Sequence, residues 1–437
     1  MHVDVTASRR ARTGVYWVFG VNGCVLATWA SRLPAIRDDL DLSPSGIGFV
    51  LLAVSVGALA GLPLSGPVVH RLGPAVTVTV AAVVCTVGVA GVGLAGTVLA
   101  LVPMLFLVGL GNGMWDVAMN VEGAEVEQRL EIEIMPRFHA AFSLGTVTGA
   151  ALGAVMAGYD VRVDVHLPLV AVAVLGGALA CTRTFLPGDH VRRGREAAAP
   201  VDEPHASGAT VEPVVGGPAV GPVAPARPAR AGGAGRGSGT LAAWREPRTL
   251  LLGLLVLGMG LSEGAANDWI AIGMVDGYDV DDGVGAAGYG CFVAAMTLAR
   301  FTGPWFLRRI GRVAALRSGA LAVLVGVSVF IAGSTLVGSA PLAVAVVVAV
   351  LGVIAWGWGA ALGFPVGMSA AADDPVRAAA RVSVVSTVGY TAFLAGPPLL
   401  GLLGDRVGVV PSLAGVVVAV VLSLVVAGSA RPLTSGR

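Results

Sequence analysis

Residues Gly46–Ala95 read GIGFVLLAVSVGALAGLPLSGPVVHRLGPAVTVTVAAVVCTVGVAGVGLA, and this segment sets the architecture of the chain. It contains two apolar runs, Gly46–Val69 and Ala75–Ala95. Each is long enough to cross a bilayer, which takes about 20 mostly apolar residues. Only the short turn around His70 separates them. The segment therefore predicts two consecutive membrane helices that run in opposite directions.

The rest of the chain repeats this pattern. Ten more apolar runs of similar length bring the total to twelve. They are Val15–Leu33, Val98–Val121, Phe138–Gly158, His166–Phe185, Leu250–Met274, Val284–Leu307, Val313–Leu336, Pro341–Ser369, Val382–Gly404 and Val409–Gly428. The composition agrees, because 55% of residues are hydrophobic and only 13% are charged, against about a quarter charged in soluble domains. We expect an all-α integral membrane protein with twelve transmembrane helices.

A segment of different composition divides the chain. Ala197–Thr240 is rich in Pro, Gly, Ala and Val and has almost no large apolar residues, so it is unable to bury a core and is predicted to be a flexible linker. The expected organisation is an N-terminal tail, a six-helix bundle, the linker, a second six-helix bundle and a C-terminal tail. Their respective ranges are 1–14, 15–186, 187–248, 249–429 and 430–437.

The distribution of arginine predicts the orientation, because cytoplasmic loops of membrane proteins carry an excess of basic residues. With the N-terminus in the cytoplasm, the outer segments hold only Arg32, Arg37, Arg162 and Arg406. Both termini are thus expected in the cytoplasm, with the chain in the inner or plasma membrane. The net charge of +1 offers no basic surface for nucleic acid.

The two halves resemble each other at corresponding positions, which predicts pseudosymmetric bundles with a site between them. The matching landmarks are Trp29 with Trp269, Arg71-Leu72-Gly73 with Arg309-Ile310-Gly311, Arg137 with Arg381, and Gly145 with Gly389.

The turn Gly66–Pro74 resembles the G-x-x-x-D-R-x-G-R/K loop of the major facilitator superfamily, and Arg308–Arg312 resembles its second copy. His70 and Arg308 stand where that family has Asp. A third match, Gly401–Gly408, fits the core pattern better but is expected on the outer side.

Two further segments resemble the fucose-permease-like branch of that superfamily: GNGMWDVAMN at Gly111–Asn120 and RFHAAFSLG at Arg137–Gly145. The resemblance implies alternating access around a cavity lined by helices 1, 4, 7 and 10. It also implies proton-coupled uptake of a sugar or similar polar metabolite, by a monomer in the lipid bilayer. Proton-driven efflux of drugs or metabolites is the alternative, and a non-transporting receptor or scaffold is a distant one.

Ionisable side chains inside a span are costly, so they are candidates for function. Asn112, Asp116 and Asn120 share one face of the fourth helix. Asp116 is a candidate proton carrier, and the amides are candidates to bind hydroxyl groups; hydrogen bonding between helices is the alternative. Glu263 and Asn267 share a face of the seventh helix. The hypothesis is that Asp116 and Glu263 face one cavity and that at least one titrates.

Other positions have two open interpretations. Asn22 is either a ligand contact or a link between helices. Trp356 and Trp358 either stack on the solute or fill the bundle. Arg300 either counters Glu263 or extends toward the cytoplasm, and the second is slightly favoured.

Arg137 and His139 begin the fifth helix near Glu122 and Glu125, which predicts either a salt-bridged inner gate or a plain interfacial anchor. His139 as a proton relay is a further option. Arg71 and Arg309, in the two family-like loops, are gate candidates as well.

The sequence argues against an enzyme. It contains no H-E-x-x-H signature of a metalloprotease and no nucleotide-binding loop of the G-x-x-x-x-G-K-[ST] type. The four cysteines lie in apolar runs without a C-x-x-C pair. We expect no catalytic residue, no metal and no cofactor, and a small-molecule solute and a proton as partners.

Overall fold

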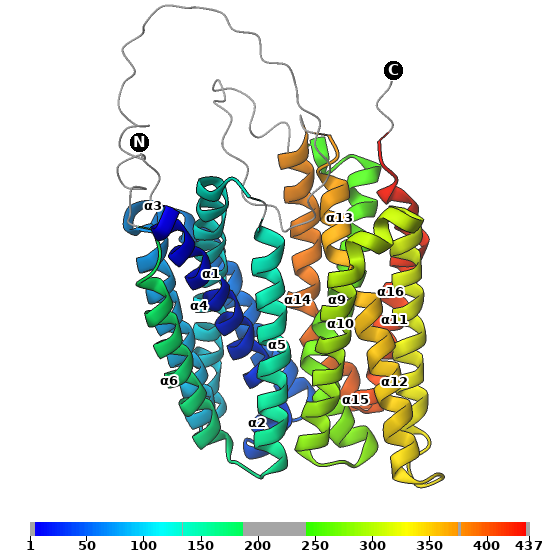
Figure 1. Cartoon of the computed structure of the whole chain (residues 1–437). Coiled ribbons are helices and arrows are strands. Elements are labelled where there is room, and N and C mark those ends of the chain that lie inside the picture. The colour runs from blue at the N-terminus through cyan, green and yellow to red at the C-terminus, as the bar shows by residue number, and fades with distance from the viewer. Residues whose placement is uncertain (1–4, 133, 187–241, 375–376, 434–437) are drawn as a thin grey trace, which may run out of the picture.

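The computed structural model describes residues 5–132, 134–186, 242–374 and 377–433, and its described residues are almost entirely helical. Two groups of helices stand side by side in Figure 1. The N-terminal group comprises α1 (Val5–Ala30), α2 (Leu33–Asp39), α3 (Pro44–Leu94), α4 (Val98–Leu130), α5 (Met135–Gly158) and α6 (Val163–Thr182). The C-terminal group comprises α9 (Pro247–Tyr278), α10 (Asp282–Ile310), α11 (Arg312–Ser334), α12 (Leu342–Ala360), α13 (Gly363–Ala371), α14 (Ala378–Val407), α15 (Val409–Ser412), α16 (Ala414–Val426) and η1 (Ala427–Ala430).

Membrane-spanning length and composition confirm the all-α membrane fold. Ten helical segments of the described chain are long and apolar enough to cross a bilayer. The 51-residue α3 counts as one of them, although its helical geometry breaks at Gly73. The 26-residue α1, which contains Asn22, is not among the ten.

Three turns of the same sequence and shape connect consecutive helices. Gly73, Gly311 and Gly408 have φ values of 80°, 79° and 90° and ψ values of 163°, 165° and 157°. Each follows an Arg by two residues. This backbone region is essentially restricted to glycine, which explains why R-x-G recurs. The third match therefore marks a real turn of the same kind, at the opposite end of the bundle from the first two.

We predict that Gly73→Ala lowers the melting temperature, because a side chain is strained at this φ by about 1–3 kcal/mol. A Cβ at Gly73 would meet nothing within 4 Å, so crowding adds no cost. Gly66→Ala is the matched control, since a Cβ there also meets nothing within 4 Å and Gly66 lies inside the helix. Thermal unfolding in detergent should show destabilisation for Gly73→Ala alone; equal melting temperatures would contradict this explanation.

The two ends of the bundle differ. We call them the α2 end and the α13 end after the helices that Figure 1 labels there. The turns around Gly73 and Gly311 lie at the α13 end, with Leu186, where the description of the N-terminal group stops. The turns at Tyr159 and Gly408 lie at the α2 end.

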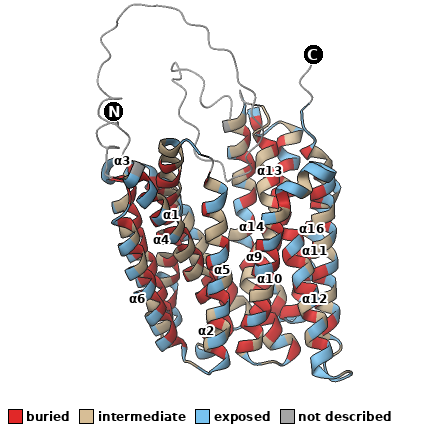
Figure 2. Ribbon diagram, viewed as in Figure 1, coloured by how far each residue is buried: buried red, intermediate tan, exposed pale blue. Residues whose placement is uncertain are grey.

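Two pairs of helices form most of the contact between the groups: α3 with α14, and α5 with α10. Small residues let the backbones approach closely. A Cβ at Gly48 of α3 would lie 2.4 Å from the Pro397 carbonyl oxygen of α14, and one at Gly283 of α10 would lie 2.7 Å from the Gly158 Cα of α5. Buried residues follow these packed faces, and exposed residues lie on the outer surface (Figure 2).

Some expected boundaries differ from the structure. Helix α1 begins at Val5, inside the segment that was expected to be a tail, and Ala11 is fully buried there. Hydropathy did not predict this part of the helix, because Arg9, Arg10 and Arg12 make it too polar to resemble a membrane span. Most of the expected linker, residues 187–241, lies outside the described residues.

Candidate functional site

The polar row on α4 is held in place by bonds to its neighbours. Asn22 of α1 donates its side-chain amide to the Asn112 side-chain oxygen at 3.1 Å, and Asn22 is buried. Asn120 donates to the Asp116 carboxylate at 3.2 Å and to the Asp116 carbonyl oxygen at 2.8 Å. Asn22 therefore links α1 to α4, whereas the Asp116 side chain is exposed and no described cation lies within ion-pair distance of it.

Glu263 has a different environment from Asp116. Arg300 of α10 donates to the Glu263 carboxylate of α9 at 2.8 Å, and the two side chains are 33% and 17% exposed. This pair corrects the slightly favoured expectation that Arg300 extends toward the cytoplasm. Removing an unpaired carboxylate from water is costly, and a cation on the neighbouring helix is well placed to neutralise one.

A break between α12 and α13 completes the environment of Arg300. Helix α12 ends at Ala360 and α13 begins at Gly363, and the Arg300 Nε–H donates to the Ala361 carbonyl oxygen at 3.5 Å. Pro365 lacks the N–H that would bond to this carbonyl in a continuous helix. The break between α12 and α13 therefore frees an acceptor at the candidate site. The helix around Pro397 and Pro398 continues without such a break.

His139 approaches this site from the other group of helices. Its ring packs edge-on against Phe19 of α1, with ring centroids 5.1 Å apart. Its Nε2 is buried and has no hydrogen-bond partner among the described residues. Arg300 is close enough to interact with His139 electrostatically. The contacts of His139 place it between the groups rather than in a salt bridge at the α13 end.

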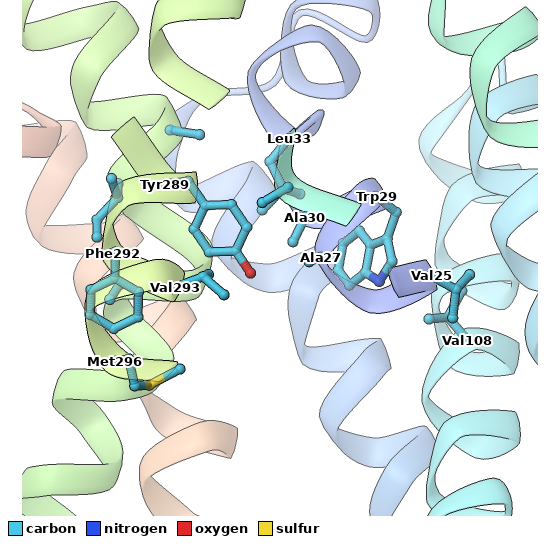
Figure 3. Close-up of a cluster of buried hydrophobic side chains, with 14 of the residues drawn as sticks. Val25, Ala27, Trp29, Ala30, Leu33, Val108, Tyr289, Phe292, Val293 and Met296 are labelled. Atoms are coloured by element: carbon cyan, nitrogen blue, oxygen red, sulfur yellow. The ribbon is translucent and has the colours of Figure 1, made fainter. Parts of the chain in front are cut away.

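Tyr289 of α10 is a site residue that the sequence reading missed. Its hydroxyl donates to the Asn267 side-chain oxygen at 3.4 Å, and it interacts electrostatically with Glu263 and Asp268. In Figure 3 the ring extends from α10 toward Ala27 and Ala30 of α1. Tyr289 is buried, so it closes the space between the groups beside these polar residues. A tyrosine within an apolar run was the available signal.

The two tryptophan candidates do not meet at a site. Trp356 is fully buried, donates its Nε1–H to the Ser262 hydroxyl at 2.8 Å, and packs against Phe292 and Phe330. These contacts favour filling of the bundle. Trp358 lines a separate recess of about 120 Å³ between α10, α11 and α12. Of the two open interpretations, filling of the bundle therefore suits both rings better than stacking on the solute.

Ser262 lies in a segment whose letters match a hydrolase motif. Gly260–Gly264 reads GLSEG, which fits the G-x-S-x-G pattern of serine hydrolases. That motif places its serine on a sharp turn between a strand and a helix, with the hydroxyl exposed. Ser262 instead lies inside α9, is fully buried, and accepts the bond from Trp356. The segment therefore matches the motif in sequence but not in structure. Ser262 contributes to packing within the C-terminal group of helices.

The expected inner gate is not formed by its proposed partners. Glu122 is fully buried and accepts the backbone N–H of Leu186 at 2.7 Å, which fixes the end of the N-terminal group. Glu125 pairs with Arg129 at 2.6 Å. Arg137 is exposed and forms no ion pair with either residue. The anchor interpretation suits Arg137 better than the salt-bridged gate.

The loop arginines are also exposed. Arg71 and Arg309 both lie at the surface of the α13 end, and Arg309 covers the ring of Trp305 at 5.5 Å. Neither forms an ion pair between the two groups in the described part of the chain. A gating role for them has no contact to support it in this conformation.

Arg381, the repeat partner of Arg137, belongs to an ion network that the sequence reading did not find. It donates to Glu246 at 2.6 Å, and Arg377 donates to the same carboxylate at 3.0 Å. Chiefly through the bond from Arg381, the pKa of Glu246 is held below its ordinary value. The pair therefore forms above that lowered pKa and is lost only as the pH falls through it. The network anchors α9 to α14 within the C-terminal group.

Among the described residues, no group of three or more His, Cys, Asp or Glu side chains is arranged to hold a metal ion. The candidate site instead consists of carboxylate, guanidinium and amide side chains joined by hydrogen bonds and one ion pair. An all-helical protein with two groups of helices, many membrane-spanning segments and ionisable residues between the groups has the architecture of a membrane transporter.

Comparison with known proteins assigns the family. The Major Facilitator Superfamily profile matches residues 15–373. The uncharacterized transporter y4wD of Sinorhizobium fredii is 32% identical over 90% of both chains. An uncharacterized MFS-type transporter of Yersinia pestis is 27% identical over 95% of this chain and 94% of its own. The membrane protein MosC of Rhizobium meliloti is 25% identical over 91% of this chain and 84% of its own. The chain belongs to the Major Facilitator Superfamily and is a multi-pass membrane transporter rather than an enzyme.

Solved structures share the fold at low sequence identity. A point mutant of the nucleoside transporter NupG has a TM-score of 0.72 at 15% identity, covering 96% of this chain and 98% of its own. A bacterial homologue of the human lysosomal transporter Spinster, solved in an inward-facing and unoccupied conformation, has a TM-score of 0.66 at 14% identity and covers 98% of both chains. At this identity the likeness concerns the fold alone.

Proposed function

We propose that this transporter has twelve spans and moves a small polar solute by alternating access, coupled to protons through Asp116. Twelve spans follow if α3 crosses twice, on either side of Gly73, and α1 crosses as well. Arginine is concentrated at the α13 end, so the positive-inside rule puts that end and both termini in the cytoplasm. The fucose-permease-like branch remains a prediction from the sequence motifs.

The observation that carries the proposal is the contrast between the two carboxylates. Glu263 has Arg300 as its counter-charge, whereas Asp116 has only the amide of Asn120. A carboxylate without a counter-charge is costly within a membrane-spanning segment even where water reaches it, and binding a proton is the direct way to neutralise it. A group that is charged in one step and neutral in another couples proton movement to the change of conformation.

The polar row beside Asp116 favours uptake of a hydroxylated solute together with a proton. Efflux in exchange for protons is the second candidate. It is favoured by three neighbouring aromatic side chains, Phe364 of α13 and Tyr390 and Phe393 of α14. Proteoliposomes distinguish them: with the pH imposed acidic outside, uptake predicts accumulation inside, and exchange predicts expulsion. Flux of neither kind, with any imposed pH difference, would contradict proton coupling.

In this conformation, the bonds that join described residues of the two groups cluster toward the α2 end. Arg37 of α2 pairs with Asp276 of α9 at 2.5 Å. The Asp405 carboxylate of α14 accepts the backbone N–H of Ser45, in the first turn of α3, at 3.0 Å. Under the proposed orientation, this is an outward-closed state. Asp405 belongs to the third R-x-G turn, where it faces a helix N-terminus that favours negative charge.

We predict that Asp405→Asn shifts the population several-fold toward an open α2 end, because the amide is a weaker partner for the α3 N-terminus. Spin labels at Tyr159 and Leu342, in a background without the four native cysteines, would report the distance between the groups at that end. Arg406→Gln is the matched control at the next residue, which is also exposed. An unchanged distance distribution for Asp405→Asn would exclude a clamp at this position.

A further inference from the structure

Three aromatic side chains form a continuous cluster in the C-terminal group of helices. Phe364 of α13 lies 6.1 Å from Tyr390 and 6.4 Å from Phe393 of α14, between ring centroids. Tyr390 and Phe393 are 6.5 Å apart. None of the three is buried, and Tyr390 is 38% exposed. The cluster is therefore not part of the packed core, unlike Trp356.

The cluster lies where the two groups of helices meet. The Phe393 carbonyl oxygen accepts a bond from the Ser55 hydroxyl of α3 at 2.9 Å. The Phe393 ring also covers the glycines of α9, since a Cβ at Gly264 would lie 3.1 Å from it. Gly264 follows Glu263 directly in the sequence. The rings are thus held at the depth of the candidate site by contacts with both groups.

Tyr390 connects the cluster to the polar row of α4. It is close enough to Asp116 for an electrostatic interaction. Within the described part of the chain, its hydroxyl has no hydrogen-bond partner. The cluster therefore belongs to the C-terminal group of helices and Asp116 to the N-terminal group, and Tyr390 is the ring of the cluster that comes near this carboxylate.

We propose that Phe364, Tyr390 and Phe393 form the apolar wall of the solute site, opposite the amide and carboxylate row, and that the solute is a ring compound with one flat apolar face and hydroxyl groups on its edge. Sugars, cyclitols and nucleosides share this chemistry. Aromatic rings recognise the flat face, and amides and a carboxylate recognise hydroxyls. The proposal deepens the proposed function, because it rests on Asp116 facing the solute.

The row on α4 favours a neutral ring over a simple cation. Its two amides flank the carboxylate, so the row offers both donors and acceptors along about 12 Å of helix. A cation would use the carboxylate alone, whereas hydroxyl groups can also use the donors and acceptors of the amides that Asn22 and Asp116 leave free. With Asp116 protonated, the site is neutral and suits an uncharged solute.

The test is a thermal-shift measurement on the purified full chain without a pH gradient. The ring probes are glucose, myo-inositol and uridine; sorbitol is the open-chain polyol, and choline is the cation. We expect at least one ring probe to raise the melting temperature and both sorbitol and choline to have no effect. No shift with any ring probe, or equal shifts with sorbitol or choline, would overturn the proposal.

Variants then assign the wall. Tyr390→Leu and Phe393→Leu keep apolar volume but remove the ring, and each should weaken binding of the active probe about tenfold; Tyr390→Phe should restore most of it. Trp358→Leu, at the separate recess, is the control and should bind normally. Unchanged binding by both leucine variants would overturn the assignment. Their proton coupling should persist at saturating solute, so this result is independent of whether Asp116 carries the proton.

Discussion

Solute accumulation driven by a pH gradient is expected to disappear when Asp116 is replaced with Asn. The asparagine amide has nearly the same shape as the carboxyl group. It keeps a polar partner for Asn120, which bonds to Asp116 in the wild-type protein. It has no titratable proton, so the side chain is permanently neutral. The variant should still exchange labelled for unlabelled solute across the membrane at equal pH, because that process needs no net proton movement.

Flux in proteoliposomes measures both properties of the Asp116→Asn protein. Glu131→Gln is a matched control, because Glu131 is an exposed carboxylate at the end of the same helix. It should retain accumulation and exchange. If Asp116→Asn still accumulated solute with normal pH dependence, the proton would have to bind elsewhere. The absence of a counter-charge at Asp116 would then not identify the proton carrier.

The second large effect concerns the pair of Arg300 and Glu263. Arg300→Gln leaves Glu263 without its counter-charge, and breaking a buried pair costs about 3–5 kcal/mol. Arg300 is a third exposed, so we expect roughly 2 kcal/mol after screening by water. The double variant Arg300→Gln with Glu263→Gln removes both charges and should recover much of this loss.

Thermal unfolding of the wild type, both single variants and the double variant forms a complete cycle. Coupling between the two positions is the expected result, with the Arg300→Gln single variant less stable than the double variant. Additive effects would show that the bond between Arg300 and Glu263 contributes no net stability, and that Glu263 tolerates isolation as Asp116 does.

Hydropathy predicted the fold because a bilayer requires long apolar helices, and such helices can be recognised as apolar runs in the sequence. It did not predict the first part of α1, where Arg9, Arg10 and Arg12 lie on a helix that begins before the apolar run. The R-x-G repeat was readable as well, since only glycine suits the backbone of Gly73 and its equivalents.

The candidate site was only partly predictable. Shared faces follow from helical period, so the row of Asn112, Asp116 and Asn120 was found. Partners on other helices depend on rotation and depth, which sequence does not encode locally. The pairing of Arg300 with Glu263 was therefore left open, with extension toward the cytoplasm slightly favoured. Trp356 was likewise left open between stacking and filling, although its ring is enclosed by the core. The aromatic wall was missed because Tyr390 and Phe364 come from different helices.

Alternating access around Asp116 is most directly tested by measuring both ends of the bundle in one protein. Spin labels at Leu72 and Ile310 report the α13 end, and labels at Tyr159 and Leu342 report the α2 end; all four side chains are exposed. Changing the pH with solute present should shorten one distance while the other lengthens, and Asp116→Asn should abolish the response to pH. Distances that move together, or remain fixed in the active protein, would contradict the account.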